Sequence, residues 1–156
     1  MIFFFLFLFF VVDFINATEI FTTKSALQNA VKQVAQGSWT GDPINEWDVS
    51  SIHDMSYLFC GDDWCVCGNA CRSFNSPIDK WDTSSVTDMA GMFLGAYGFN
   101  QPLETWNVCG VIDFDFMFSG SSYSYGSLST SNCRVCEEGK YSGNGEFIAI
   151  FNSQGI

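Results

Sequence analysis

The chain has 156 residues, seven cysteines and a formal net charge of −11, with 17 Asp and Glu against 6 Lys and Arg. This length suits one domain, or one small domain with tails. The acidic balance argues against a nucleic-acid binder and against an electrostatic membrane-surface binder, because both need clustered Lys and Arg. Aromatic residues make up 17% of the chain, which argues against a disordered protein.

Residues 1–17 have the pattern of a secretory signal peptide. An unbroken apolar run extends from Ile2 to Val12 and is too short to span a membrane. Ala17 is small enough to precede a signal-peptidase cut, although no Lys or Arg precedes the run, so an uncleaved anchor is the alternative. We predict cleavage after Ala17 and a mature chain without a membrane span, secreted or displayed at the cell surface.

All seven cysteines follow the predicted cleavage site, and cysteines outside the cell usually oxidise. An odd number leaves one cysteine free, paired with another chain, or paired beyond this sequence. A zinc site and a redox pair are alternatives, but the spacing of the first four cysteines is a poor match to zinc-ribbon ligands. We predict disulfides of open connectivity among Cys60, Cys65, Cys67, Cys71, Cys109, Cys133 and Cys136.

Three segments in the middle of the chain align without gaps: PINEWDVSSIHDMSYLF, PIDKWDTSSVTDMAGMF and PLETWNVCGVIDFDFMF. We divide residues 43–118 into repeats 43–76, 77–101 and 102–118. The first repeat carries a Cys-rich insertion at 60–71, which we interpret as a loop closed on itself by a disulfide. The columns predicted to form the repeat core are Trp47, Trp81, Trp106, Ile52, Val86, Val111, Phe59, Phe93 and Phe118.

Each repeat is expected to contain a short strand followed by one helical turn. The I-x-x-W-D-V-S segment alternates as a strand does, and D-M-x-x-M-F spaces apolar residues at i, i+3 and i+4. One copy has too little apolar surface to bury alone, so the copies are expected to stack. Asp54, Asp88 and Asp113 directly precede the turns, where we expect each carboxylate to cap the turn.

The flanking segments differ from the repeats. In the region 18–42, residues Thr22 to Ala35 place apolar side chains at helical spacing, with Thr22 or Thr23 as the cap and Gly37 as the end. We expect this helix to cover the start of the stack. Residues 119–132 read as a Ser/Gly/Tyr linker. The tail 133–156 begins with a pattern similar to the opening of receptor-like Cys-rich modules.

The run W-D-[VT]-S-S-[IV]-x-D-M-x-x-[LM]-F, with F-N-x-P between copies, resembles the BspA-like leucine-rich-repeat surface proteins, known as domain of unknown function 285. Copy three departs from the pattern at Asn107, Cys109 and Phe114. The resemblance implies an α/β fold, a short right-handed leucine-rich-repeat-like solenoid of about three turns with an N-terminal capping helix. It also implies an extracellular protein, and adhesion or recognition roles are known for some members.

The sequence holds no glycine-rich phosphate loop, nucleophile elbow or His-Glu metal motif, so we expect neither an enzyme nor a cofactor. His53 occupies a variable repeat position and is interpreted as a solvated loop residue. Aligned Asp columns could bind calcium, but Asn107 breaks the first column and capping explains the second.

We predict a non-enzymatic recognition or adhesion scaffold whose partner is an unknown protein or glycan, and not a nucleic acid. One alternative is a carbohydrate-binding module that uses the Trp column or the Cys60–Cys71 loop. Another is the amino-terminal part of a larger receptor-like extracellular protein, because the tail resembles the start of a second module.

Overall fold

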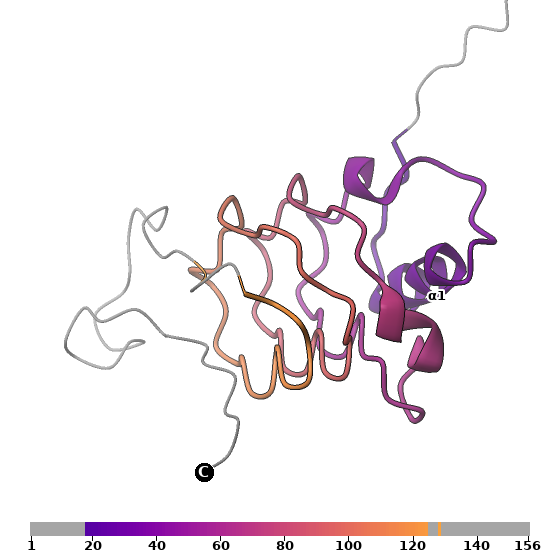
Figure 1. The fold of residues 1–156 in the computed structure, drawn as a ribbon. Coiled ribbons are helices and arrows are strands. Elements are labelled where there is room, and N and C mark those ends of the chain that lie inside the picture. Colours follow the sequence, from indigo (N-terminus) through magenta and orange to yellow (C-terminus); the bar gives the residue numbers. More distant parts are fainter. Residues whose placement is uncertain (1–17, 125–127, 129–156) are drawn as a thin grey trace, which may run out of the picture.

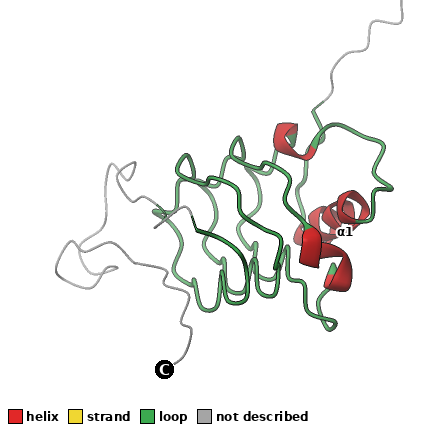
Figure 2. Cartoon of the chain, viewed as in Figure 1, coloured by secondary structure: helices red, strands yellow, loops and turns green. Residues whose placement is uncertain are grey.

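The computed structural model describes residues 18–124 and Leu128, with the elements in the order α1, η1, η2 (Figure 1). Helix α1 spans Lys24–Ala35, and the 3-10 helices η1 and η2 span Ile44–Glu46 and Gly68–Ser73. The rest of the described chain winds through turns and loops into a stack, with α1 at one end (Figure 2). No helix among the described residues is both long and apolar enough to cross a membrane.

Helix α1 forms where the sequence predicts a helix. The Thr23 hydroxyl accepts a hydrogen bond from the Ala26 N–H at 3.3 Å, which satisfies one of the free donors at the helix start. Gly37, with a φ of 69°, follows the last turn in the left-handed conformation that ends many helices. The face of the helix that joins the common core of the stack consists of Leu27, Ala30 and Val31.

The expected α/β solenoid of leucine-rich repeats is wrong, because the described residues form no sheet. The W-D-V-S segment that we predicted as a strand is turned instead. The Asp48 carboxylate accepts from the Ser50 N–H at 3.0 Å, and the Ile52 N–H donates to the Val49 carbonyl at 2.9 Å. The β-bridges of the described chain are the isolated parallel bridges Ile20↔Asp48, Asp54↔Asp88 and Asp88↔Asp113.

The predicted helical turn is also absent, because in copies one and two alternate N–H groups bond to the next copy and the others close i→i−3 turns. An N–H that donates to a neighbouring copy is not available for the i→i−4 bond of a helix. Tyr57 has a φ of 56°, which lies outside the right-handed helical region. The bonds from copy one to copy two, each 2.8–2.9 Å long, are Met55 to Asp88, Tyr57 to Ala90 and Phe59 to Met92.

Three ladders of aromatic rings run along the stack and form its core. Equivalent rings in consecutive copies lie within 19° of parallel, with centroids 5.1 to 6.4 Å apart. Each such pair contributes about 0.5–1.5 kcal/mol beyond the burial of its surface. The ladders are Trp47–Trp81–Trp106, Phe59–Phe93–Phe118 and Phe74–Phe99–Tyr123, and the column of Ile52, Val86 and Val111 is buried beside them.

The third copy continues beyond Phe118, into the segment that we assigned to a linker. Tyr123 stacks on Phe118 with ring centroids 4.1 Å apart, and burial raises the pKa of its hydroxyl to about 12. The Ser124 N–H donates to Asn100 Oδ1 just as the Asn100 N–H donates to Asn75 Oδ1. Residues 123–124 therefore take the place of the Phe-Asn pairs of the earlier copies. The predicted signal peptide and the tail 133–156 lie outside the described residues.

Candidate functional site

Two columns of mainly acidic side chains shape the turns of the stack. The first column is Asp48, Asp82 and Asn107, and the second is Asp54, Asp88 and Asp113. Asp82 Oδ1 accepts from the Ser84 N–H at 3.0 Å, and the amide oxygen of Asn107 accepts equivalently from the Cys109 N–H at 3.1 Å. Asn107 therefore keeps the hydrogen bond of its column although it lacks the charge. In the second column Asp54, Asp88 and Asp113 each accept from the N–H two residues later, at 2.8–2.9 Å, which makes them turn formers rather than helix caps.

Hydrogen bonds also hold the charged form of two of these carboxylates. The Ser50 hydroxyl and N–H lower the pKa of Asp48. Partial burial alone would raise the pKa of Asp54, but hydrogen bonds from Lys24 and Ser56 outweigh it and leave that pKa below its usual value. Among the residues that the structure describes, no group of three or more His, Cys, Asp or Glu side chains could hold a metal ion.

The Trp column lies inside the stack and is not a binding surface. Its rings are at most 3% exposed, so the interpretation of this column as a sugar-binding strip is wrong. Trp81 Nε1 donates to the Ile44 carbonyl at 2.7 Å, and Trp106 Nε1 donates to the Ile78 carbonyl at 3.0 Å. Each indole therefore bonds to the backbone of the preceding copy as well as filling the core.

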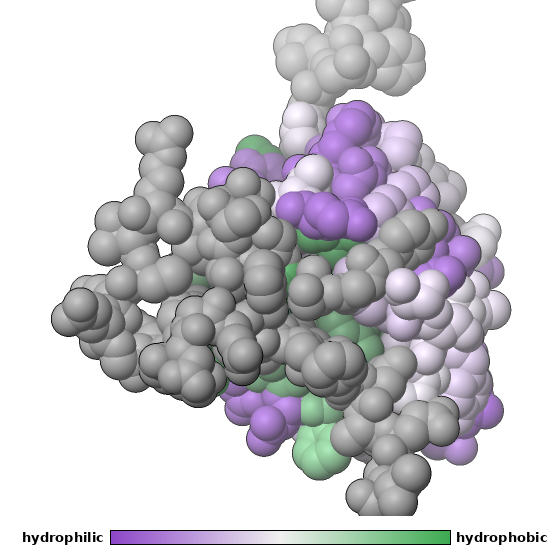
Figure 3. Space-filling model, turned by 60° about the vertical axis from the view of Figure 1, so that its left-hand side comes forward, coloured by the Kyte–Doolittle hydropathy of each residue, from purple (hydrophilic) through white to green (hydrophobic). Residues whose placement is uncertain are grey.

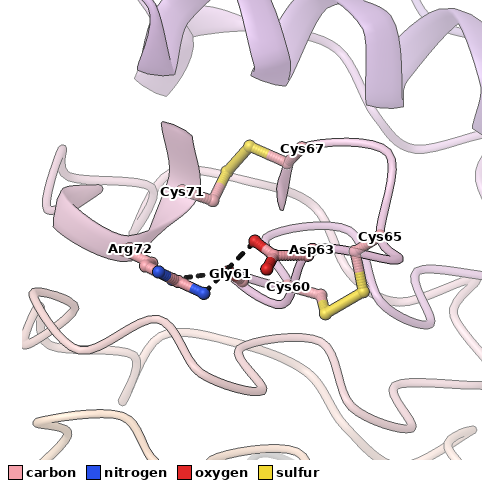
Figure 4. Close-up of a disulfide and its surroundings, with 7 residues drawn as sticks. All are labelled: Cys60, Gly61, Asp63, Cys65, Cys67, Cys71 and Arg72. Carbon is pink, nitrogen blue, oxygen red and sulfur yellow. Dashed lines mark hydrogen bonds and ion pairs between the residues drawn. A yellow bond between two sulfur atoms is a disulfide. The ribbon is translucent and has the colours of Figure 1, made fainter. Parts of the chain in front are cut away.

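The Cys-rich insertion is closed by two disulfides, Cys60–Cys65 and Cys67–Cys71, which settle its connectivity (Figure 4). Arg72, at the end of η2, turns back onto the loop. Its Nε donates to the Gly61 carbonyl at 3.0 Å, and its Nη2 lies 3.3 Å from Asp63. Cys109 is disulfide-bonded as well, whereas Cys133 and Cys136 lie outside the described residues.

The stapled loop presents Trp64 to solvent. This side chain is 66% exposed, although tryptophan is rarely left so open on a folded protein. Its ring meets the half-buried ring of Tyr57 edge to face, with centroids 5.1 Å apart. The Trp64 ring therefore packs against copy one through Tyr57, while most of its surface is exposed to solvent.

One repeat position directly precedes the buried column of Leu58, Met92 and Met117. It is occupied by Tyr57, Gly91 and Phe116 in the three copies, and all three have φ between 56° and 57°. Gly91 leaves room for its neighbour: the Tyr57 ring lies 2.3 Å from where a β-carbon on Gly91 would stand. Phe116 in the third copy is 66% exposed.

Tyr57, Trp64 and Phe116 together form what we call the aromatic strip, in which Tyr57 and Trp64 belong to the first copy and Phe116 to the third. With a spacing of about 4.8 Å between paired backbones, Tyr57 and Phe116 start about 10 Å apart. Hydrophobic side chains reach the surface of this stack between hydrophilic ones (Figure 3). The aromatic strip is the candidate functional site.

Sequence reasoning missed the aromatic strip, although one signal was present. The column of Tyr57, Gly91 and Phe116 directly precedes the apolar column of Leu58, Met92 and Met117, and its mixture of rings and glycine does not suit a core position. His53, which we interpreted as a solvated loop residue, is exposed. Its backbone carbonyl accepts a hydrogen bond from the Thr87 N–H at 2.8 Å. Its ring contacts the Ser51 carbonyl at 3.2 Å.

A shallow cleft of about 400 Å³ lies near the end of α1, between Trp39 and Pro43. Its polar groups are largely engaged within the chain. Trp39 Nε1 donates to the Asp42 carbonyl at 2.8 Å, and the Asn45 amide bonds to Asp79 and to the Lys80 N–H. It therefore offers fewer free recognition groups than the aromatic strip.

Comparison with known proteins identifies one family. The model of the family described as "Mycoplasma protein of unknown function, DUF285" matches residues 25–141, which is three quarters of the chain. No curated protein and no solved structure matches the chain. The match covers helix α1, all three stacked copies and both disulfides of the insertion, and the chain therefore belongs to the DUF285 family.

Proposed function

We propose that the chain is a secreted or surface-displayed recognition module that acts by binding rather than by catalysis, with the aromatic strip as its contact surface. The observation that carries this proposal is the exposure of Trp64 and Phe116 on a framework whose three ring ladders are buried. Exposed aromatic side chains cost solubility, and they are enriched at binding surfaces because they supply large contact area with few rotatable bonds.

The rigidity of the framework supports the same conclusion. Trp64 sits on a loop of which both halves are stapled, and Tyr57 is seated over Gly91. A preorganised ring loses little conformational freedom on binding, which favours affinity. The kinship with BspA-like surface proteins, suggested by the repeat pattern, fits a module of this kind.

The secretory part of the proposal rests on the leader-like residues 1–17 and on the disulfides. Two disulfides within twelve residues suit an oxidising compartment. The test is to express the tagged full chain in cells that secrete and to alkylate free thiols on recovery. We expect the medium to contain a chain shortened at its N-terminus, whose disulfide-bonded cysteines do not react with the alkylating reagent. Chain retained in the cytosol with reduced thiols would contradict export.

The binding part is tested with beads that carry the chain. Surfaces coated with defined extracellular proteins and defined glycans are offered to the beads. We expect retention on at least one surface, and loss of that retention in the Trp64→Ala/Phe116→Ala variant. Ile20→Ala is the matched control, since Ile20 is equally exposed but is not part of the aromatic strip. Failure of every surface to retain the beads would overturn the proposal.

A further inference from the structure

We propose that the aromatic strip binds a cationic segment of a partner protein, with Arg or Lys side chains lying over its rings. This inference rests on the proposed recognition function and names the chemistry of its ligand. It commits to a basic peptide segment rather than to a glycan, and a glycan is one outcome of the test.

The rings supply the first half of the site. The faces of Trp, Tyr and Phe attract cations through their quadrupole, and Trp does so most strongly. Trp64 is the most accessible indole among the described residues, and Phe116 is equally open. Tyr57 contacts the Trp64 ring and fills the space over Gly91 of the second copy. Successive Arg or Lys side chains of one segment could therefore each contact a ring of the aromatic strip.

Acidic residues directly precede both exposed rings of the strip in the sequence. Asp62 and Asp63 precede Trp64 in the turn that the Cys65 N–H closes on the Asp62 carbonyl at 3.0 Å. The Asp62 side chain reaches across to the second copy, where its Oδ1 lies 2.7 Å from the position of a β-carbon on Gly95. Asp115 precedes Phe116 and is exposed. These charges complement a basic segment and repel an acidic one.

The chain already holds one guanidinium in this way on the same loop. Arg72 lies 3.3 Å from the Asp63 carboxylate, and its Cζ lies 6.0 Å from the centre of the exposed Tyr97 ring. A carboxylate and an aromatic face therefore cooperate on an arginine next to the strip. Trp64 follows Asp62 and Asp63 in the sequence, and Phe116 follows Asp115, so each exposed ring has a carboxylate close to it along the chain.

The net charge of the whole molecule points to the same class of ligand. At −11, the chain attracts basic partners and disfavours anionic ones such as acidic peptides, nucleic acids and anionic membranes. A neutral glycan could stack on the rings and donate its hydroxyls to the carboxylates, but it carries no charge for them to attract. The salt dependence and the charge dependence of binding therefore separate the two ligand classes.

The experiment measures the affinity of the full chain for a fluorescent arginine-rich peptide by anisotropy. Matched peptides carry citrulline, the uncharged analogue of arginine, or glutamate in the same positions. We expect the arginine peptide to bind, the other two to bind at least tenfold more weakly, and affinity to fall severalfold at high salt, where charges are screened. We expect Trp64→Ala to weaken binding about tenfold.

Two further variants separate the contributions of charge and fold. Asp62→Asn/Asp115→Asn should weaken the arginine peptide severalfold and leave the citrulline peptide unchanged. Glu104→Gln, which removes an exposed charge near Tyr123, is the matched control and should bind as the wild type does. Circular dichroism and a thermal melt check that each variant is folded.

The outcomes are distinct. Equal binding of arginine and citrulline peptides, or no binding of either, overturns the cationic ligand. If a neutral glycan binds in a manner that depends on Trp64 and Phe116, the recognition function stands but the ligand class proposed here is wrong. If a coated surface retains the beads but the retention does not depend on Trp64 or Phe116, the choice of the aromatic strip as the binding site is wrong as well.

Discussion

The ring of Tyr57 lies over Gly91, with Cε1 only 2.3 Å from the position that a β-carbon on that glycine would occupy. The two residues hold the same position in consecutive copies, and both have left-handed backbone, with φ of 56° and 57°. The Tyr57 ring can therefore occupy this position only because copy two has glycine at residue 91. This dependence links the fold of the turn to the presentation of the aromatic strip.

Gly91→Ala is expected to destabilise the chain through two separate effects. Left-handed backbone costs a non-glycine residue about 1–2 kcal/mol, and the new methyl group displaces the Tyr57 ring. Gly37→Ala is the matched control, because Gly37 has a φ of 69° but open space around it, so only the backbone cost applies. Urea unfolding should show a larger loss for Gly91→Ala, and adding Tyr57→Ala to that variant should recover the difference. Equal losses in both glycine variants would refute the contact.

Trp81→Ala should remove about 3–5 kcal/mol from the free energy of unfolding. Trp81 is buried between two other indoles and donates a hydrogen bond to the Ile44 carbonyl, so its loss leaves a cavity and an unsatisfied acceptor. Trp64→Ala removes the same chemical group from the surface and should cost less than about 0.5 kcal/mol. Chemical denaturation of both variants decides the point, and similar losses would mean that Trp64 is a core residue.

Asp82→Ala should cost about 1 kcal/mol, whereas Asp82→Asn should be close to neutral. The reason is that Asp82 acts through an acceptor oxygen for the Ser84 N–H, and Asn107 does the same in copy three without a charge. Denaturation midpoints of the two variants test this. If Asp82→Asn is as damaging as Asp82→Ala, the charge rather than the hydrogen bond matters.

Acid should destabilise the chain partly through Asp48. Hydrogen bonds from the Ser50 hydroxyl and N–H lower its pKa below 3.8 in the folded state. The resulting stabilisation is present above the pKa of the unfolded chain and is lost as the pH falls through the lower folded pKa. Ser50→Ala, which removes the hydroxyl donor, should raise the pKa of Asp48 toward its ordinary value. An NMR titration of the Asp48 carboxyl measures it, and an unchanged pKa would contradict the assignment.

Removal of the Cys60–Cys65 disulfide by paired Ala substitutions should cost about 2 kcal/mol, as the chain-entropy account gives for a loop this short. The same change at Cys67–Cys71 should cost a similar amount. The two variants should differ in ligand binding, because Trp64 lies within the first loop and outside the second. Thermal melts and the peptide assay together test this. Equal binding by both variants would show that the first disulfide does not position Trp64.

Helix α1, the register of the repeats and the identity of the stacked rings were readable from the sequence. Each depends on local or periodic information: the apolar stripe of α1, the cap at Thr23, and the recurrence of Trp and Phe in aligned columns. The oxygen acceptors at Asp54 and its equivalents were also readable as turn-forming groups, although the turn they form is not helical.

The strand and the helical turn predicted for each repeat failed for two different reasons. The W-D-V-S segment turns because Asp48 accepts from the Ser50 N–H. In the following segment an N–H can donate within its own copy or to the next, and Met55, Tyr57 and Phe59 donate to copy two, so no helix forms. The extension of copy three to Tyr123 escaped detection because a Tyr-Ser pair replaces the Phe-Asn pair of the other copies.

The sequence by itself determined that three similar units stack, which side chains fill the stack, and where its one α-helix in the described chain begins and ends. Those properties follow from apolar periodicity and from capping groups only a few residues away. The tertiary structure decided where the backbone hydrogen bonds go and which rings stay outside. Trp64, Tyr57 and Phe116 become one surface because bonds between copies bring together residues up to 59 positions apart, from Tyr57 to Phe116. No local pattern specifies that proximity.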